Sequence, residues 1–420
     1  MKRIAIIGAG LTGLTAALRA AQHGLQVDLY EAAPEAGGRT RSFFHQPSQT
    51  WVDHGPHLLI GAYEHTQHLL SDIGAASSVT WQSSLCLPLW EQQRGHFALN
   101  TSPYMPFPLA LLTAIIKMPH HGWYRIPEVL RLAISMRQTQ HGSVASWMKK
   151  QNISEALQRD MLEILCLGAM NEGMDSAPAA SFAQVLQRAF ATHQSARLGW
   201  FNQPLSTALI QPLVHQAEQL GVRIQTSCSV QKLEHHAQAC TLHTRHHTQR
   251  YDAIILATPP HIRNQLLHIK QTQYSQSISN IHLWFEEDLS LTQPLIGGIG
   301  TYGQWFFDIR QQHQSSGLSH LCAIISADHA TLSQQEKIDQ VLQELARITG
   351  KANLHPIHSK VISVRHATHL VRPYPMADLP PHVLDACEQP RPGALPATIE
   401  TAIERGEQAA VQCVFNLENS

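Results

Sequence analysis

A glycine-rich turn close to the N-terminus constrains the fold of this 420-residue chain more than any other feature. The run Gly8-Ala9-Gly10-Leu11-Thr12-Gly13 follows an apolar, strand-like stretch at residues 3–7 and precedes an alanine-rich, helix-like stretch at residues 14–23. A second strand-like stretch at residues 25–31 completes a strand–helix–strand unit. Such a unit predicts an α/β fold that opens with a parallel, doubly wound sheet.

The spacing of the three glycines suits the diphosphate of a dinucleotide. Gly8 permits a tight turn, Gly10 allows the backbone to approach the phosphates, and Gly13 allows the helix to pack closely on the strand. Leu11 and Thr12 stand at the start of the helix, where unpaired N–H groups and a partial positive charge favour an anion. We therefore expect a bound nucleotide here, rather than a glycine turn without a ligand.

The residues after this unit bear on which nucleotide is bound. Glu31 ends the second strand, where a carboxylate can accept hydrogen bonds from a ribose, and its charge disfavours a 2′-phosphate. Gly38 and Arg39 end a Gly-Gly-Arg run of the kind that FAD proteins use, in which glycine permits close approach and arginine reaches the phosphates or the flavin. Strands near Val230 and at residues 254–257 supply later elements of such a fold. These features favour FAD over NAD.

Charge and composition exclude several classes of protein. Lys and Arg total 30 and Asp and Glu total 31, and this near-zero balance argues against nucleic-acid binding, which needs a basic stripe. Hydrophobic residues make up 43% of the chain, which is enough for a large core. Charged residues make up only 15%, against ~25% in typical soluble proteins. The low charge leaves room for an apolar surface that contacts a membrane or a lipophilic substrate.

Cysteine usage and the apolar runs predict a cytoplasmic protein. The seven cysteines are scattered without a Cys-x-x-Cys pair, which suits reduced thiols. The first apolar run is too short for a signal peptide, and no uninterrupted apolar run reaches the roughly 18 residues of a membrane-spanning helix. A histidine-dense stretch at residues 235–247 predicts a solvated hairpin. A metal site there is the alternative, but the spacing matches no standard ligand pattern, so we expect no metal.

The chain pattern predicts two interleaved domains. Residues 32–100 are mostly polar, residues 104–190 mostly helical, residues 280–330 alternate like strands, and residues 397–414 form a closing helix. We predict an α/β protein with a two-dinucleotide-binding, Rossmann-like FAD domain interleaved with a mixed α+β substrate domain. The FAD domain is assigned to residues 1–75, 200–265 and 375–420, and the substrate domain to residues 76–199 and 266–374.

Four stretches, spread over nearly the whole chain, carry a family resemblance. They are residues 4–41, the run Asp53-His54-Gly55-Pro56-His57-Leu58-Leu59-Ile60-Gly61-Ala62-Tyr63, residues 144–171, and residues 395–400. They resemble the FAD-dependent amine oxidase and phytoene desaturase superfamily, and within it most closely the squalene-associated branch, the hydroxysqualene dehydroxylases. The first stretch is generic to the superfamily, and the second and third are the specific ones.

The resemblance implies positions for the flavin. Gly55, with Pro56 and His57 beside it, would approach the isoalloxazine ring, and Thr398 and Ile399 would open the final helix at the flavin pyrimidine. Helix N-terminal amides there would stabilise negative charge on the reduced flavin. A plain N-cap role for Thr398 is compatible with this contact.

One segment departs from the family pattern. The family has Ala-Gly-Asp before the last helix, where the glycine meets the diphosphate and the aspartate holds the ribityl chain. The matching segment here is Ala386-Cys387-Glu388, one residue out of step, so that Cys387 adds a side chain and Glu388 takes the place of the aspartate. Thr401 stands where the family has a glycine. FAD binding is still expected, with a weaker affinity or a different loop path as the consequence.

The resemblance also implies a reaction, the reductive removal of the hydroxyl of hydroxysqualene to give squalene for hopanoid synthesis, with a functional link to squalene-synthase-like enzymes. His57 and His54 are the candidates for the proton donor, because histidine titrates near neutral pH. A structural hydrogen-bonding role is the alternative for His57. Two other hypotheses remain open: a desaturase or amine oxidase that uses the flavin in the opposite direction, and a non-catalytic FAD-fold protein that binds lipid.

A lipophilic substrate needs an entrance from lipid, and residues 104–118 are a candidate for it. This stretch is a short, strongly apolar helix that ends at Lys117, with Trp123 and Tyr124 just beyond it. Aromatic and basic residues anchor helices at a membrane interface, so we expect peripheral membrane contact. An ordinary buried helix is the alternative.

Overall fold

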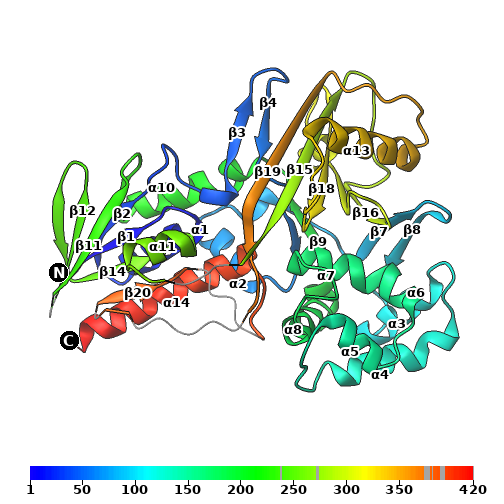
Figure 1. Ribbon diagram of the computed structural model, residues 1–420, viewed down its shortest axis with the longest axis horizontal. Helices are drawn as coiled ribbons and strands as arrows, with labels where there is room; N and C mark the ends of the chain where they lie inside the picture. The colour runs from blue at the N-terminus through cyan, green and yellow to red at the C-terminus, as the bar shows by residue number, and fades with distance from the viewer. Residues whose placement is uncertain (237–238, 271–273, 373–378, 381, 388–392, 420) are drawn as a thin grey trace.

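A five-stranded parallel sheet carries the N-terminal glycine turn (Figure 1). The structure is a computed structural model that describes residues 1–236, 239–270, 274–372, 379–380, 382–387 and 393–419. In order across the sheet, the strands are β10 (Arg223–Gln225), β2 (Gln26–Tyr30), β1 (Arg3–Ile7), β14 (Ala253–Leu256) and β20 (Val383–Asp385). All neighbouring strands are parallel, and the predicted α/β fold class is confirmed.

The two faces of this sheet are covered by different layers, and β1 shows why its sequence is apolar throughout. Ile4 and Ile6 pack among residues of the helices on one face, whereas Ala5 and Ile7 pack among residues of a small antiparallel sheet on the other. A parallel strand covered on both faces needs a continuous apolar run rather than an alternating one.

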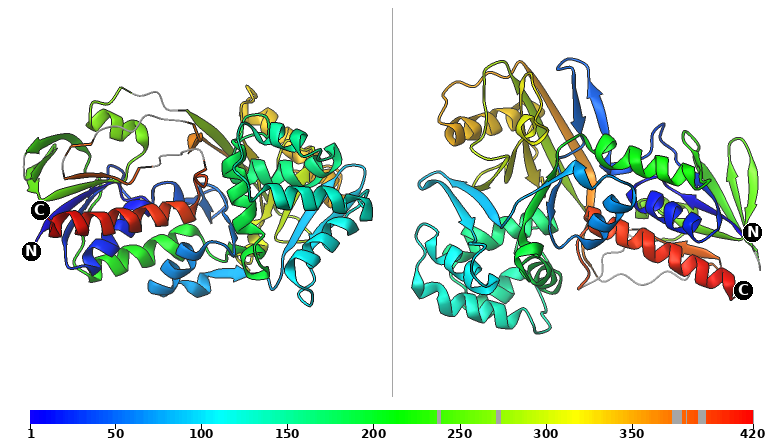
Figure 2. Two further views of the ribbon diagram at one scale, coloured as in Figure 1. Left: turned by 90° about the horizontal axis from the view of Figure 1, so that it is seen from below. Right: turned by 180° about the vertical axis from the view of Figure 1, so that it is seen from behind.

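The helices on the first face are α1 (Leu11–Gln22), α2 (Glu64–Asp72), α10 (Gln211–Gln219) with the π-helical turn η5 (Ser206–Ile210) before it, and α14 (Ile399–Glu418). Figure 2 shows α14 alongside α1. Their backbones touch at Gly406, where an added Cβ would lie 2.4 Å from the carbonyl oxygen of Thr12. Only a glycine, which has no Cβ, allows the two helix backbones to approach each other this closely.

The opposite face carries α11 (Pro260–Leu266) and an antiparallel sheet of β11 (Val230–His236), β12 (Ala239–Thr244) and β13 (Thr248–Tyr251). The histidine-dense stretch forms these hairpins. His235 and His236 on β11 are both exposed to solvent.

A seven-stranded sheet forms the second half of the molecule. In order across the sheet, its strands are β19 (His358–His369), β15 (Ser275–Phe285), β18 (Ser319–Ser326), β17 (Trp305–Asp308), β16 (Leu295–Ile299), β7 (Cys86–Glu91) and β8 (Gly95–Asn100). The helix α13 (Gln334–Thr349) covers one face, where Leu321 and Ala323 pack with Val341. The other face packs against a group of helices, with Cys322 among the buried residues of that side.

That helical group is α3 (Phe107–Lys117), the 3₁₀ turn η3 (Trp123–Arg125), α4 (Ile126–Ser135), α5 (Val144–Lys150), α6 (Glu155–Leu157), the π-helical turn η4 (Gln158–Leu162), α7 (Glu163–Met170), α8 (Ala179–Ala189) and α9 (His193–Ala196). The strongly apolar stretch predicted at residues 104–118 forms α3, which is buried on one side and exposed at Leu109. Within the described residues, no helix is long and apolar enough to cross a membrane.

Short elements link the two halves. They are the 3₁₀ turns η1 (Gly38–Thr40) and η2 (Ala76–Ser78), the hairpin β3 (Ser42–His45) and β4 (Thr50–Asp53), and the sheet of β5 (Leu58–Ile60), β9 (Leu198–Phe201) and β6 (Val79–Trp81). The short helix α12 (Ile309–Gln312) lies within the second half, between β17 and β18. The β5–β9–β6 sheet contains strands from both of the predicted domains. The division of the chain into domains stays a prediction.

Candidate functional site

The glycine turn has the geometry of an anion site. Gly8 has a φ of +102°, and an added Cβ would lie 2.6 Å from the carbonyl oxygen of Ala257. At Gly13 the same atom would lie 1.8 Å from the carbonyl oxygen of Gly8. At Gly10, in contrast, no atom from beyond the adjacent residues lies within 4 Å of the position that a Cβ would take. A ligand can therefore approach the backbone at Gly10, while the other two glycines are required by the fold itself.

The start of α1 is also prepared for an anion. Gly10 is the N-cap and has no side chain to accept the first N–H groups, and the first turn, which includes Leu11 and Thr12, contains no acidic residue. The unpaired N–H groups and the helix dipole favour a negatively charged ligand. The open side at Gly10 and this uncapped helix start fit the diphosphate of a dinucleotide.

Glu31 lies where a ribose would meet the turn. One carboxylate oxygen accepts from the N–H of Ala9 at 2.7 Å and the other from the N–H of Ala33 at 2.8 Å. These two bonds orient the carboxylate and leave acceptor positions for ribose hydroxyls. The backbone N–H of Cys228 donates to the carbonyl oxygen of Glu31 at 2.8 Å, which brings the start of β11 and Val230 to the same end of the sheet.

A small cavity of about 270 Å³ adjoins this end of the sheet. Ala32, Ser227, Cys228, Ser229, Gln231, Arg245 and His246 line it. Its position next to Glu31 and Val230 suits the adenosine side of a dinucleotide.

The Gly-Gly-Arg run packs against the glycine turn. The N–H of Gly37 donates to the carbonyl oxygen of Ala9 at 2.7 Å, and an added Cβ on Gly38, whose φ is +55°, would lie 3.2 Å from the Cα of Gly10. The side chain of Arg39 reaches the second half of the molecule, where its guanidinium donates to the carbonyl oxygen of Ala367 in β19. The structure thus brings together two predicted glycine motifs that are about 30 residues apart, as expected for a single phosphate-binding surface.

His57 and His54 lie in the segment that follows β4. Burial and the charge of Arg39 lower the pKa of His57 to about 4. Burial, with the charge of Arg41, also lowers the pKa of His54. Both imidazoles are therefore neutral at neutral pH, so each can donate or accept a hydrogen bond but carries no extra proton.

Asn280 in β15 packs directly on Gly55 and was not foreseen from the sequence. An added Cβ on Gly55 would lie 2.9 Å from the side-chain oxygen of Asn280, so the amide itself requires the glycine. The amide nitrogen donates to the carbonyl oxygen of His54 at 2.8 Å, whereas the buried amide oxygen has no hydrogen-bond partner among the described residues. A buried, unsatisfied acceptor is costly, so this oxygen suits a donor group of a ligand beside Gly55 and Pro56.

Asp53 is a second candidate site residue that the sequence alone did not indicate. Its carboxylate accepts from the hydroxyl of Ser42 at 2.5 Å and from the N–H of Leu205 at 3.0 Å. Burial raises the pKa of Asp53 to about 6. A buried carboxyl with a raised pKa is typical of functional sites, and the signal in the sequence was its place immediately before His54 and Gly55.

The start of α14 is capped by its own side chains. The hydroxyl of Thr398 accepts from the N–H of Thr401 at 3.2 Å, and the N–H of Thr398 donates to the hydroxyl of Thr401 at 2.9 Å. Thr401, where the family pattern has a glycine, thus completes a capping box. Ile399 is buried in the core beside α1. The carboxylate of Glu400 accepts from two N–H groups at the start of α2 and so turns away from the helix end.

The departure at Cys387 is accommodated within the sheet. Its thiol donates to the carbonyl oxygen of Leu256 at 3.4 Å and lies 3.7 Å from the hydroxyl of Thr258, so the side chain points into the packed strands. Burial is the main cause that raises the pKa of this thiol well above its usual value. Glu388 lies outside the described residues, and its predicted contact with the ribityl chain stays a prediction.

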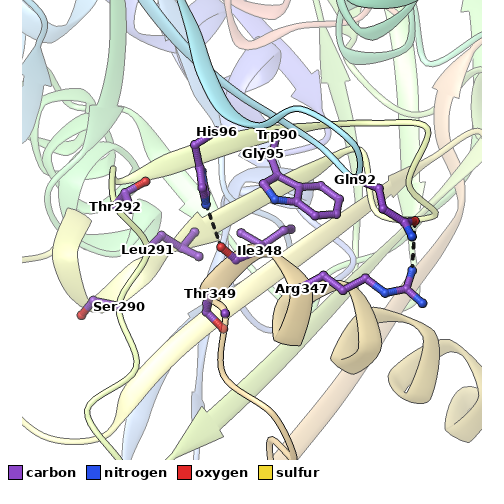
Figure 3. Close-up of a pocket in the computed structure, with 11 residues that line it drawn as sticks. Trp90, Gln92, Gly95, His96, Ser290, Leu291, Thr292, Arg347, Ile348 and Thr349 are labelled. Carbon is purple, nitrogen blue, oxygen red and sulfur yellow. Dashed lines mark hydrogen bonds between the residues drawn. The ribbon is translucent and has the colours of Figure 1, made fainter.

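A second open cavity, of about 670 Å³, lies elsewhere (Figure 3). Figure 3 shows Trp90 and His96 of the β7–β8 hairpin facing Arg347 and Ile348 at the end of α13, with His96 hydrogen-bonded to the carbonyl oxygen of Ile348 at 2.7 Å. None of the predicted site residues lines this cavity.

Comparisons with known proteins agree with this geometry. A family model described as flavin containing amine oxidoreductase matches residues 11–414. The chain is 25% identical to a hydroxysqualene dehydroxylase of Sinorhizobium fredii over 97% of both chains, and 23% identical to a 15-cis-phytoene desaturase of Capsicum annuum over 82% of this chain and 64% of the desaturase. Its fold resembles that of an oxidoreductase from Methanosarcina mazei with a TM-score of 0.74 at 15% identity, over 98% of this chain and 99% of the other. The chain therefore belongs to the flavin-containing amine oxidoreductases and is an FAD-dependent oxidoreductase.

Proposed function

We propose that this protein reductively removes the hydroxyl group of hydroxysqualene and releases squalene, a reaction of hopanoid biosynthesis. The observation that carries the proposal is the extent of the match to the hydroxysqualene dehydroxylase of Sinorhizobium fredii, which covers 97% of both chains. The match to the phytoene desaturase covers 64% of that longer protein. A match along both full lengths includes the substrate-binding half, and not only the dinucleotide-binding elements that a whole superfamily shares.

The bound cofactor has defined anchors in this chain. The uncapped start of α1 and the open side of Gly10 would hold the diphosphate of FAD, and Glu31 would hold the adenosine ribose. The first N–H groups of α14, after Thr398, would face the flavin pyrimidine. Reduced FAD, when bound, would supply a hydride to the carbon that loses the hydroxyl, and the hydroxyl would leave as water with one proton taken up from solvent.

The residues around Gly55 would orient the substrate hydroxyl. His57 is neutral because its pKa is lowered to about 4, so its ring N–H is a hydrogen-bond donor to the departing oxygen. Asn280 holds the backbone at His54 in place. His57 and His54, the candidates from the sequence for the proton donor, are proposed instead as neutral hydrogen-bond donors to this hydroxyl, because their lowered pKa values favour that role.

The test is a product analysis on the flavin-loaded enzyme. The full chain is purified with FAD, reduced without air, mixed with hydroxysqualene, and analysed by mass spectrometry. Squalene is expected in proportion to the flavin that is reoxidised. A yellow protein that forms no squalene would overturn the proposal.

Desaturation of a carotenoid precursor is the second candidate function, because several relatives are phytoene desaturases. In that case the oxidised enzyme would be bleached by phytoene without air, while hydroxysqualene would leave the reduced enzyme unchanged. An amine that bleaches the oxidised enzyme would likewise assign it to amine oxidation.

A further inference from the structure

The helical group exposes a cluster of large apolar side chains at one end of the molecule. Tyr104 is 95% exposed, Trp123 78% and Ile134 62%. Six of the fourteen large apolar residues that are exposed among the described residues fall between positions 104 and 134. We call these six residues the α3–α4 face: Tyr104, Leu109, Trp123, Tyr124, Leu130 and Ile134.

The apolar character of this face follows from the way α4 packs. Leu132 and Ser135 face the core, where the hydroxyl of Ser135 accepts from the indole N–H of Trp147 at 3.1 Å. Leu130 and Ile134, four residues apart, lie together on the opposite, exposed side. A surface helix normally places polar residues on that side, whereas α4 presents Leu130 and Ile134 to solvent there.

The face is held in place by buried contacts rather than by a loose loop. Asp160 is fully buried in η4 and binds Arg94 through two bonds of 2.7 and 2.8 Å. The same carboxylate binds His121 at 2.9 Å, which fixes the connection between α3 and η3. The hydroxyl of Tyr124 donates to the carbonyl oxygen of His120 at 2.9 Å. Trp123 and Tyr124 are therefore exposed on a fixed platform.

Positive charge is concentrated around this face. Residues 101–150 contain six of the 30 Lys and Arg residues of the chain but only one of its 31 Asp and Glu residues, Glu128, which pairs with Arg125. The side chain of Arg131 donates to the carbonyl oxygens of Gln151 and Asn152 at 2.9 and 3.1 Å, so the end of α5 lies against α4. That contact places the charges at the end of α5 next to the apolar cluster.

Four of these cations are free to meet an external anion. Lys117, Arg137, Lys149 and Lys150 are exposed and form no ion pair with another described residue. Outside residues 101–150 the chain has more acidic than basic residues, so the positive charge is concentrated in this part of the protein. A fixed apolar face with aromatic side chains and a border of unpaired cations matches the surface of an anionic bilayer.

We propose that the α3–α4 face docks on the surface of an anionic membrane. The aromatic and aliphatic side chains enter the interfacial region, and the lysines and Arg137 contact lipid phosphates. A second copy of this chain is a poorer occupant, because pairing two such faces would bring like charges together. The docking does not rest on the proposed reaction, but it would place the protein where a lipophilic substrate dissolves.

Vesicle sedimentation with the FAD-loaded full chain tests this proposal. We expect binding to vesicles of phosphatidylcholine mixed with phosphatidylglycerol, weaker binding to phosphatidylcholine alone, and a decrease with added salt. The triple variant Trp123→Ser, Leu130→Ser, Ile134→Ser should bind the mixed vesicles at least about tenfold more weakly. The double variant Lys149→Gln, Lys150→Gln should bind the mixed vesicles more weakly than the wild type does, and its binding to phosphatidylcholine alone should not change.

Matched controls come from exposed aromatic residues elsewhere. Trp51 lies on the β3–β4 hairpin, away from α4 in Figure 1, and Phe415 lies on α14; both are exposed. Trp51→Ser and Phe415→Ser should leave vesicle binding unchanged. Flavin content and the thermal midpoint, measured for every variant, establish that the variants are folded.

Three results would overturn the proposal. They are the absence of binding to mixed vesicles, a folded triple variant that binds as the wild type does, and equal losses in the control variants. A dimer in light scattering that the triple variant dissociates, without vesicle binding, would assign the face to a second copy instead. Because none of these measurements uses the reaction, they separate a failure of docking from a failure of the proposed function.

Discussion

The pKa of His57 determines which form of its side chain meets a substrate at neutral pH. Burial and the charge of Arg39 lower this pKa to about 4, so the imidazole is neutral over the physiological range. A neutral imidazole donates a hydrogen bond well but is a poor proton donor, because loss of its last proton would leave an anion. If the substrate is the proposed hydroxysqualene, hydrogen bonding to its hydroxyl is therefore the role that the environment of His57 favours.

Two substitutions at His57 separate these roles. His57→Gln keeps a neutral donor and should retain most of the single-turnover rate, whereas His57→Leu should lower it about tenfold. The rate attributable to His57 should be independent of pH above about pH 5, because the folded-state pKa lies below that value. A wild-type rate that falls tenfold for each pH unit from pH 5 upward would instead require an imidazolium donor.

At this scale the sequence revealed the motifs but not their neighbours. The glycine turn, Glu31 and the Gly-Gly-Arg run were recognisable because each occupies a fixed place in a short, local unit. Asn280 was not, because it lies more than 200 residues from Gly55 and is one of several polar residues in its strand, with nothing local to distinguish it. The contact between the two exists only through the tertiary fold.

At the scale of elements, the packing of α14 on α1 supports the cofactor site. Gly406 lets the two backbones meet, since an added Cβ would lie 2.4 Å from the carbonyl oxygen of Thr12 and 2.9 Å from the Cβ of Thr15. Arg19 of α1 also binds Glu407 of α14 at 2.6 Å. The position of α14 thus depends on the same helix whose N-terminus is prepared for the diphosphate.

Gly406→Ala should therefore destabilise the protein and weaken FAD binding together. We expect the free energy of unfolding to fall by on the order of 1–3 kcal/mol, because the helices must separate. Gly173→Ala is the matched control, since no atom from beyond the adjacent residues lies within 4 Å of the position that a Cβ would take at Gly173. Urea unfolding and flavin titration measure the two effects. Equal behaviour of the two variants would contradict the close packing at Gly406.

Element prediction succeeded where one face or both faces of an element are apolar. Residues 3–7 form β1 as predicted, whereas α1 begins at Leu11 rather than residue 14, because Gly13 belongs to the helix for close packing and not to the turn. Residues 32–100 contain strands β3 to β8, which the polar composition concealed. Strands of three to six residues depend on their partners more than on their own sequence.

At the scale of the whole molecule, stacked aromatic rings connect the β3–β4 hairpin to a buried pair of histidines, His282 and His320, in the seven-stranded sheet. His45 of the β3–β4 hairpin stacks on Trp284 with ring centroids 4.7 Å apart, and Trp284 stacks on His320 at 4.4 Å. His320 is hydrogen-bonded to His282 at 3.0 Å. Burial lowers the pKa of His282 to about 3 and that of His320 well below its usual value.

These shifts predict a loss of stability in mild acid. In the unfolded chain a histidine takes up a proton near pH 6.5, whereas in the folded state His282 stays neutral to about pH 3. The stability from His282 is thus fully present above pH 6.5 and is lost as the pH falls toward 3, at on the order of 1.4 kcal/mol per pH unit. Asp53 opposes this trend, because its pKa is raised to about 6.

Urea midpoints measured at intervals from neutral pH downward check this prediction, with exposed His235 changed to Gln as the control. The midpoint should fall with pH in the wild type and in His235→Gln alike, because the solvent-exposed imidazole is not part of the buried pair. A midpoint that rises as the pH falls from 6.5 would show that Asp53 outweighs the buried histidines.

Deuterium incorporation during a single turnover is the most direct test of the proposed dehydroxylation. The flavin-loaded enzyme is reduced in heavy water without air, mixed with hydroxysqualene, and its product analysed by mass spectrometry. Because the transferable hydrogen of a reduced flavin exchanges with solvent, the proposed reaction should give squalene that carries a single deuterium, in proportion to the flavin reoxidised. The absence of squalene, or squalene without deuterium, would contradict it.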